Sequence, residues 1–502
     1  MVKKNKRSHL VIVIMAFLPY LLYGFQYFPI LDDYIQYGCY PIYEKTSHVF
    51  FTIGTLSTRP LAGLLDPVLW GRMWPCLWVG LILITTMHVL SAFLFRQVLE
   101  KAGYTVGPFF LLIYLLFPLG MEGRFWLSAS SRLVTGLFFA ALSLFILSSV
   151  LPFKEGKTKS KWWFCLFFFL QLISCGFYES VSVFSVMAAV LLTLVSMYQA
   201  KENFSNRQNW QLRCIKKYPI LLAAPLVSVI NIGLMFTYYR VFAGLGAIGS
   251  RADQASIEML WAKAGSLFSQ LGEIFSLAYH ATIGGSVLGI KLLWNSGVWG
   301  LFILFLTAVL CVLLALFNKK RKKKVRAKFI IMEICGLLLF FGPLIPNMLA
   351  AEVWLTNRSI FVSLLGMALM AEPLFALFPG RFRQILLGLT AFIFLTATVN
   401  EYDVYKRVYE QDTRLLQQVV TEMNAESIAG EKEAHVVLPK EVKTEQNAYY
   451  KDHVKSVFDS DWALTGALRA TIRSLQPKRI QPLLPGEDYE KENVQTIYVE
   501  IK

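Results

Sequence analysis

Long apolar runs, separated by short loops in which lysine and arginine cluster, constrain this chain more than any other feature. Several runs reach the roughly 20 residues that an α-helix needs to cross a bilayer. Hydrophobic residues make up 56% of the 502 residues and charged residues 16%, which is less charge than a soluble protein of this length carries. A transmembrane β-barrel would show alternation of polar and apolar residues instead. The sequence therefore predicts an all-α polytopic membrane protein.

The apolar runs predict about eleven transmembrane helices. The stretch 162–198 is too long for one helix, and we divide it at 176–180. A polar turn over 122–132 precedes the fourth helix. The predicted spans are about 10–27, 74–95, 106–119, 133–151, two within 162–198, 218–239, 297–317, 329–349 (broken by Gly342-Pro343 and Pro346), 359–378 and 384–400.

The basic residues predict which ends of these helices face the cytoplasm. Lys3, Lys4, Lys6 and Arg7 precede the first span, no small-x-small cleavage site follows it, and the strongest basic cluster lies at 319–324. Cytoplasmic loops of membrane proteins carry this excess, so the net charge of +16 does not indicate a nucleic-acid partner. We expect a multi-pass protein of the plasma (inner) membrane with a cytoplasmic N-terminus.

Composition changes at about residue 401, where the apolar runs end. The predicted elements beyond it are an amphipathic helix over 401–425, strands over 435–439 and 496–501, and a helix over 462–475 that Asp461 caps. An odd number of spans places this part outside the cytoplasm. We therefore expect a membrane domain over 1–400 and a small extracytoplasmic α/β domain over 401–502.

Two long segments between spans are expected on the same outer side. The first outer loop, about 29–72, contains a stretch over 47–69 with helical spacing, which suits one helix lying along the membrane surface. Residues 243–295 are predicted to form a long loop with an amphipathic piece around 256–280. The outer side therefore has enough chain to build a site.

Two adjacent carboxylates, Asp32 and Asp33, directly follow the first predicted span. An acidic pair at a membrane exit is costly unless water, a cation or a chemical task accompanies it. Carboxylates can act as general bases toward a sugar hydroxyl, and guanidinium groups hold phosphate bidentately. The other polar residues on this predicted side are Arg59, Glu122, Arg124, Trp126, Arg132, Tyr178, Glu179, Arg240, Arg251, Asp253, Glu352 and Arg358. Together they predict one active site at the outer membrane surface.

Four short motifs among these residues resemble a known superfamily. They are Leu31-Asp32-Asp33-Tyr34 after the first span, Arg59-Pro60-Leu61, Tyr178-Glu179, and Asn357-Arg358-Ser359 opening a late span. They are similar to those of the C-type (GT-C) superfamily of polytopic membrane glycosyltransferases. The resemblance implies an enzyme that moves a sugar from a polyprenyl-phosphate donor to a cell-envelope glycan or lipid-linked acceptor at the extracytoplasmic face.

The resemblance also implies roles for single residues. Asp32 or Asp33 would be the base, and the other would position the acceptor or bind a divalent cation such as Mg²⁺ or Mn²⁺. Arg59 and Arg358 would contact the donor phosphate. The implied substrate-binding set is completed by Tyr178, Glu179, Arg124 and Arg251.

The residues alone leave alternatives open. A transporter or flippase of lipid-linked glycans would place charges at mid-membrane depth and show repeated halves, whereas these charges gather at one face. A polysaccharide polymerase would also place arginines in outer loops. The plainer interpretation is that Asp32-Asp33 is a hydrated turn or helix cap, that Arg59 and Arg358 anchor at the headgroups, and that Tyr178-Glu179 is a polar turn.

Overall fold

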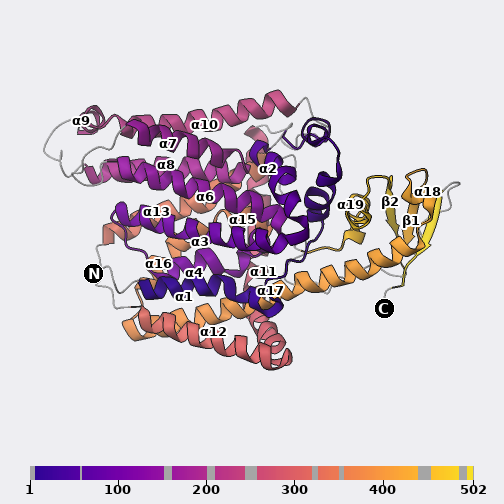
Figure 1. Ribbon diagram of the computed structural model, residues 1–502. Coiled ribbons are helices and arrows are strands. Elements are labelled where there is room, and N and C mark those ends of the chain that lie inside the picture. Colours follow the sequence, from indigo (N-terminus) through magenta and orange to yellow (C-terminus); the bar gives the residue numbers. More distant parts are fainter. Residues whose placement is uncertain are drawn as a thin grey trace.

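Long helices laid side by side dominate the computed structural model (Figure 1). It describes residues 6–56, 59–151, 161–200, 210–243, 257–318, 326–349, 355–438, 454–484 and 494–500. Six helical stretches in the described chain are long and apolar enough to cross a membrane: Pro60–Lys101, Leu127–Val150, Glu179–Ala200, Gly297–Phe317, Phe329–Met348 and Gly380–Glu422. Four shorter apolar helices accompany them: Arg7–Tyr23, Trp162–Cys175, Ile220–Met235 and Leu364–Ala376. The chain is therefore a multi-pass membrane protein.

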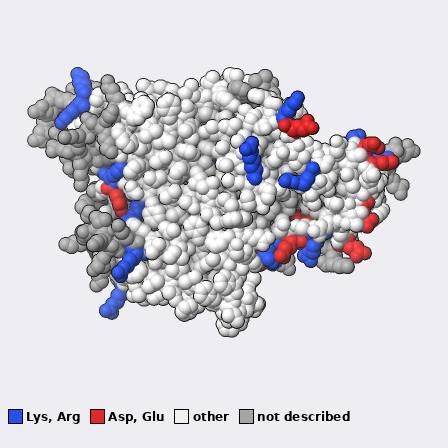
Figure 2. Space-filling view, in the orientation of Figure 1, with Lys and Arg blue, Asp and Glu red and all other residues white. Residues whose placement is uncertain are grey.

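The helices of the bundle overlap the predicted spans. They are α1 Lys6–Phe17, α3 Leu77–Lys101, α4 Pro108–Leu116, α6 Leu127–Val150, α7 Lys161–Cys175, α8 Glu179–Ala200, α10 Ile220–Ala243, α12 Gly297–Phe317, α13 Arg326–Phe341, α16 Leu364–Ala376 and α17 Gly380–Glu422. Figure 2 shows charged side chains at the two ends of the molecule and a broad uncharged surface between them. We call the end that carries the C-terminal strands the distal end; the N-terminus lies at the opposite, proximal end (Figure 1).

Both predicted helix breaks are present. Helix α7 ends at Cys175 and α8 begins at Glu179, which divides the stretch 162–198 as expected. Helix α13 ends at Phe341 and is followed by the short turns η10 Gly342–Leu344 and α14 Ile345–Leu349, because Pro343 and Pro346 cannot donate to a helical ladder. A broken helix at membrane depth is tolerated where it packs against protein rather than lipid.

Two predictions about the outer segments are wrong. Residues 47–69 do not form one surface helix: Gly54 with φ of 82° and Pro60 divide them into short helical pieces. The pieces are η5 His48–Thr52, α2 Pro60–Leu65 and η6 Asp66–Trp70, and η7 Gly71–Cys76 leads into α3. Residues 243–295 are not mainly loop, since α11 Ile257–Asn295 is one continuous helix. A Cβ at Gly289 would lie 1.9 Å from the Thr396 carbonyl oxygen, so glycine allows α11 to pack directly on α17.

Helix α17 joins the last predicted span to the C-terminal domain without interruption. Its 43 residues include both the predicted span over 384–400 and the predicted amphipathic helix over 401–425. No glycine or proline occurs over 389–422, so nothing in the backbone ends the helix at the membrane surface. It emerges from the bundle at the distal end and carries the domain (Figure 1).

The C-terminal domain is a three-stranded parallel sheet in the order β2-β1-β3. Its elements are α18 Ala425–Ile428, β1 Glu433–Val437, η11 Val457–Asp459, α19 Asp461–Ile472, β2 Ile480–Leu483 and β3 Val494–Tyr498. The two predicted strands and the predicted helix are present, and β2 is an additional strand, with Ala434 of β1 opposite both Ile480 and Gln495. A second hydrophobic core, which includes Leu415, Phe458 and Leu464, lies between the sheet, α19 and α17.

Candidate functional site

A tight turn places the acidic pair at the distal end. Leu31, directly before the pair, has a φ of 42°, a backbone conformation that non-glycine residues rarely adopt. The Asp33 amide donates to the Ile30 carbonyl (2.9 Å), and the Ile30 amide donates to Asp33 Oδ2 (3.1 Å). The Asp33 side chain therefore closes the turn that holds it. Strain of this kind persists only where the surrounding contacts enforce it.

Asp33 also caps helix α6. Its Oδ1 accepts from the Ser128 amide (2.9 Å), and its Oδ2 accepts from the Tyr27 hydroxyl (2.6 Å). The same hydroxyl accepts from the Leu127 amide (2.7 Å), so the first two amides of α6 are both satisfied. Asp33 is fully buried, and burial raises its pKa to about 7, although the bonds from Tyr27, Ile30 and Ser128 act in the opposite direction. Both carboxylate oxygens of Asp33 thus accept hydrogen bonds that hold the local structure together.

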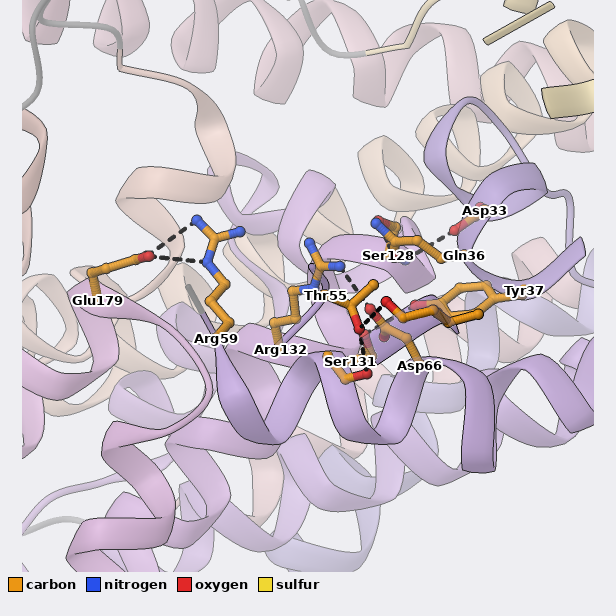
Figure 3. Close-up of polar contacts among 12 residues, drawn as sticks. Asp33, Gln36, Tyr37, Thr55, Arg59, Asp66, Ser128, Ser131, Arg132 and Glu179 are labelled. Carbon is orange, nitrogen blue, oxygen red and sulfur yellow. Dashed lines mark hydrogen bonds and ion pairs between the residues drawn. The ribbon is translucent and has the colours of Figure 1, made fainter. Parts of the chain in front are cut away.

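Asp32 lies in a different environment from its neighbour. It is half-buried, and its charge acts on Arg132, Asp66 and Tyr40. Arg132 Nη2 donates to Asp66 Oδ2 at 2.8 Å in a nearly buried ion pair (Figure 3). Asp32 therefore lies near enough to Arg132 and Asp66 to interact with both electrostatically.

The pairing of Asp66 with Arg132 could not be read from the sequence. Helix α6 begins at Leu127, six residues before the predicted start of the span, so Ser131 and Arg132 lie in its second turn rather than in a polar loop. Tyr37 Oη lies 3.0 Å from Ser131 Oγ and fixes the same turn to the acidic loop. The only sequence signal was that Asp66 and Arg132 fall on the same predicted side of the membrane.

Three residues that the sequence grouped on one face do lie together. The Arg59 guanidinium donates through Nε and Nη2 to the Glu179 carboxylate at 3.1–3.2 Å and lies 4.1 Å from the centre of the Tyr178 ring. The Leu61 amide donates to the Gly176 carbonyl (3.1 Å), which fixes this segment to the α7–α8 break. Arg59 also interacts electrostatically with Arg132, and the two guanidinium groups point to the same side in Figure 3.

Arg358 forms a second polar group beside the start of α6. Its amide donates to Glu122 Oε2 (3.0 Å), its Nε lies 3.9 Å from Glu122 Oε1, and its guanidinium lies 5.2 Å from the Trp126 ring centre. Arg358 belongs to the short helix α15 Asn357–Phe361, which is separate from α16. Arg358 therefore lies outside the longer helix α16, and the Glu122 carboxylate already accepts from its amide.

The remaining predicted site residues are placed as follows. Arg124, in the short helix α5 Glu122–Phe125, is buried, and its guanidinium donates to the Leu115 carbonyl and to Thr398 Oγ1 (3.3 Å), so it links α4 to α17 inside the bundle. Arg251 lies outside the described residues, as do Asp253 and Glu352, and the Arg240 side chain is also not described.

Two of the buried donors that have no hydrogen-bond partner within the described part of the chain lie at the start of α6. They are Trp126 Nε1 and Arg132 Nε. Leaving a buried donor unsatisfied costs about 1–3 kcal/mol, so both would gain from an acceptor oxygen. For a metal ion the residues fit less well: no group of three or more His, Cys, Asp or Glu is positioned to hold one among the residues that the structure describes. Asp33, already bound by three donors, is a poor candidate ligand.

The site combines a half-buried carboxylate, two neighbouring guanidinium groups and aromatic faces. Ion pairs with Asp66 and Glu179 hold the guanidinium groups of Arg132 and Arg59 in place, so little ordering is needed when an anion arrives. The chain matches no family model, no curated protein and no solved structure. The chemistry of these side chains is therefore the basis for assigning a function.

Proposed function

We propose that this protein is a membrane glycosyltransferase with a GT-C-like helical domain. It moves a sugar from a polyprenyl-phosphate donor to a cell-envelope glycan or lipid-linked acceptor. The observation that carries the proposal is the cluster at the distal end, where the Arg132 guanidinium, paired with Asp66, points to the same side as that of Arg59 and interacts electrostatically with half-buried Asp32. A base and a phosphate clamp, at the end of an apolar helix bundle, are the groups that this reaction requires.

In the proposed step an acceptor hydroxyl oxygen attacks the anomeric carbon of the donor sugar. The bond between that carbon and the phosphate oxygen breaks, and the polyprenyl phosphate leaves with the bonding electron pair. Asp32 takes the proton of the hydroxyl as general base. Arg132 and Arg59 stabilise the negative charge that develops on the leaving phosphate, because guanidinium groups bind its oxygens in a planar, bidentate way.

The distal end faces the extracytoplasmic side in this proposal. The basic loops of the sequence, including 319–324, follow helices at their proximal ends, as the positive-inside rule requires of cytoplasmic loops. Reporter fusions in the loop at Lys322 and near Lys440 are expected to lie on opposite sides of the membrane. Finding both on the same side would contradict this orientation.

The transfer reaction is tested with purified protein in liposomes and radiolabelled polyprenyl-phosphate sugars. We expect label to leave the donor for an acceptor, and Asp32→Asn to reduce turnover about 10²–10⁴-fold, the usual effect of losing a positioned base. Glu410→Gln is a matched control, because Glu410 is an exposed acid paired with Lys406 away from the cluster. Near wild-type turnover of Asp32→Asn would exclude Asp32 as the base. Label that crosses the membrane while still attached to its donor would favour a transporter.

A further inference from the structure

The C-terminal domain packs directly on the acidic loop. Helix α19 contacts η3 Tyr34–Cys39, a single wide helical turn that begins immediately after Asp33. Cys39 Sγ donates to the Gly466 carbonyl at 3.1 Å, and Tyr34 and Cys39 belong to the core of the C-terminal domain rather than to that of the bundle. The turn that follows the acidic pair is thus part of the domain's own core.

Two glycines make this contact close. A Cβ at Gly466 of α19 would lie 2.5 Å from Ile35 Cγ1, and a Cβ at Gly38 of η3 would lie 2.5 Å from Ala470 Cβ. Both distances are shorter than real Cβ contacts, so any side chain at either glycine must push the two helical segments apart. The segments interlock in both directions, with a glycine of each facing a side chain of the other.

We propose that the C-terminal domain is the positioning element of the acidic loop: α19, docked on η3, holds the turn that carries Asp32 against α6, the helix that carries Arg132. Three observations support a role beyond packing. The strained residue Leu31 lies between the two cores and contacts both. Asp33 ties the same turn to α6, the helix that carries Arg132. The turn is therefore held on one side by α6 and on the other by α19. The role in catalysis rests on the proposed function, whereas the positioning does not.

Gly466→Ala is the primary perturbation. Alanine is a better helix former than glycine, so the change would stabilise α19 if the surface were open. At the interface its Cβ meets Ile35 and forces α19 away from η3. In Gly466→Ala/Ile35→Ala the two Cβ atoms would be 3.8 Å apart, an ordinary van der Waals contact. Docking should therefore fail in the single variant and return in the double one.

Hydrogen exchange of the full-length protein in detergent measures the positioning without reference to activity. We expect Gly466→Ala to raise exchange at the amides of Ile30, Leu127 and Ser128, which the acidic turn and Tyr27 protect in the native protein. The double variant should restore protection. If exchange in Gly466→Ala rises only within 425–484, or nowhere, α19 does not hold the acidic loop and the inference fails.

A second pair and a control make the test independent of one substitution. Gly38→Ala should have the same effect as Gly466→Ala, and adding Ala470→Gly should reverse it, because the methyl group is then transferred from one surface to the other. Gly272→Ala in α11 is the matched control, since a Cβ there meets no atom within 4 Å, and it should leave exchange at the acidic turn unchanged. Failure of the exchanged pair to restore protection would contradict interlocking at this site.

Turnover then tests the catalytic consequence. Gly466→Ala should lower kcat about tenfold or more with little change in KM for the donor, because misplacement of a base affects the chemical step, and the double variant should recover it. Unchanged kcat with raised exchange would overturn the role in catalysis. A wild type that transfers no sugar would refute the proposed transferase, while the exchange data alone would still decide whether the domain positions the loop.

Discussion

Substitution by alanine should lower the stability of the protein at Asp33 and its turnover at Asp32. Asp33→Ala removes the acceptor of three donors: the Tyr27 hydroxyl and the amides of Ile30 and Ser128. At about 1–3 kcal/mol for each buried donor left unsatisfied, the loss is about 3–9 kcal/mol. We expect about 3–5 kcal/mol of the unfolding free energy, because the Tyr27 hydroxyl still accepts from Leu127 and can turn.

Asp32→Ala should behave differently, because Asp32 is half-buried rather than fully buried. We expect a loss of about 1 kcal/mol or less, typical of a partly exposed charge, together with loss of sugar transfer. Unfolding by sodium dodecyl sulfate in mixed micelles, followed by tryptophan fluorescence, measures the first quantity, and turnover at permissive temperature measures the second. Equal destabilisation by both variants, or an Asp33→Ala protein as stable as wild type, would refute the division of roles.

Three further changes test the rest of the site. Arg132→Lys should lower turnover at least tenfold, because lysine keeps a charge for Asp66 but loses the planar fork. Arg358→Ala should raise the donor KM, and Arg358→Lys should not fully substitute; unchanged kinetics would make Arg358 an anchor. Burial raises the Asp33 pKa to about 7 in the folded state, so protonation of Asp33 favours folding below about pH 4, and this protonation-linked part of the stability is lost as pH rises through 7. Asp33→Asn should remove that part, and the melting temperature should then change less between pH 4 and pH 7.

The helical framework was predictable because apolar length and basic loops are strong, local signals. The division of α7 from α8 and the breaks at Pro343 and Pro346 were correctly placed. What failed depended on tertiary packing. Residues 243–295 were predicted as mostly loop, yet α11 is one continuous helix, and Gly285 and Gly289 are where it approaches α17.

The sequence grouped candidate residues on one side of the membrane, but it did not predict which of them pair. Arg59, Tyr178 and Glu179 were grouped correctly on one face, and the structure joins them directly. The sequence treated Asp32 and Asp33 as equivalent, because adjacent residues of one type carry no information about which side chain turns inward. Asp66 was passed over for a similar reason, since its partner lies 66 residues away on another helix.

Helix α17 fixes the rotation of the C-terminal domain about the helix axis as well as its distance from the membrane. At about 1.5 Å rise per residue its 43 residues extend about 65 Å, roughly twice the hydrocarbon thickness of a bilayer. A continuous helix transmits rotation, and each inserted residue turns everything beyond it by about 100°. The contact of α19 with η3 thus exists for one register of α17 alone. The length of this helix, rather than a flexible tether, sets which face of the domain meets η3.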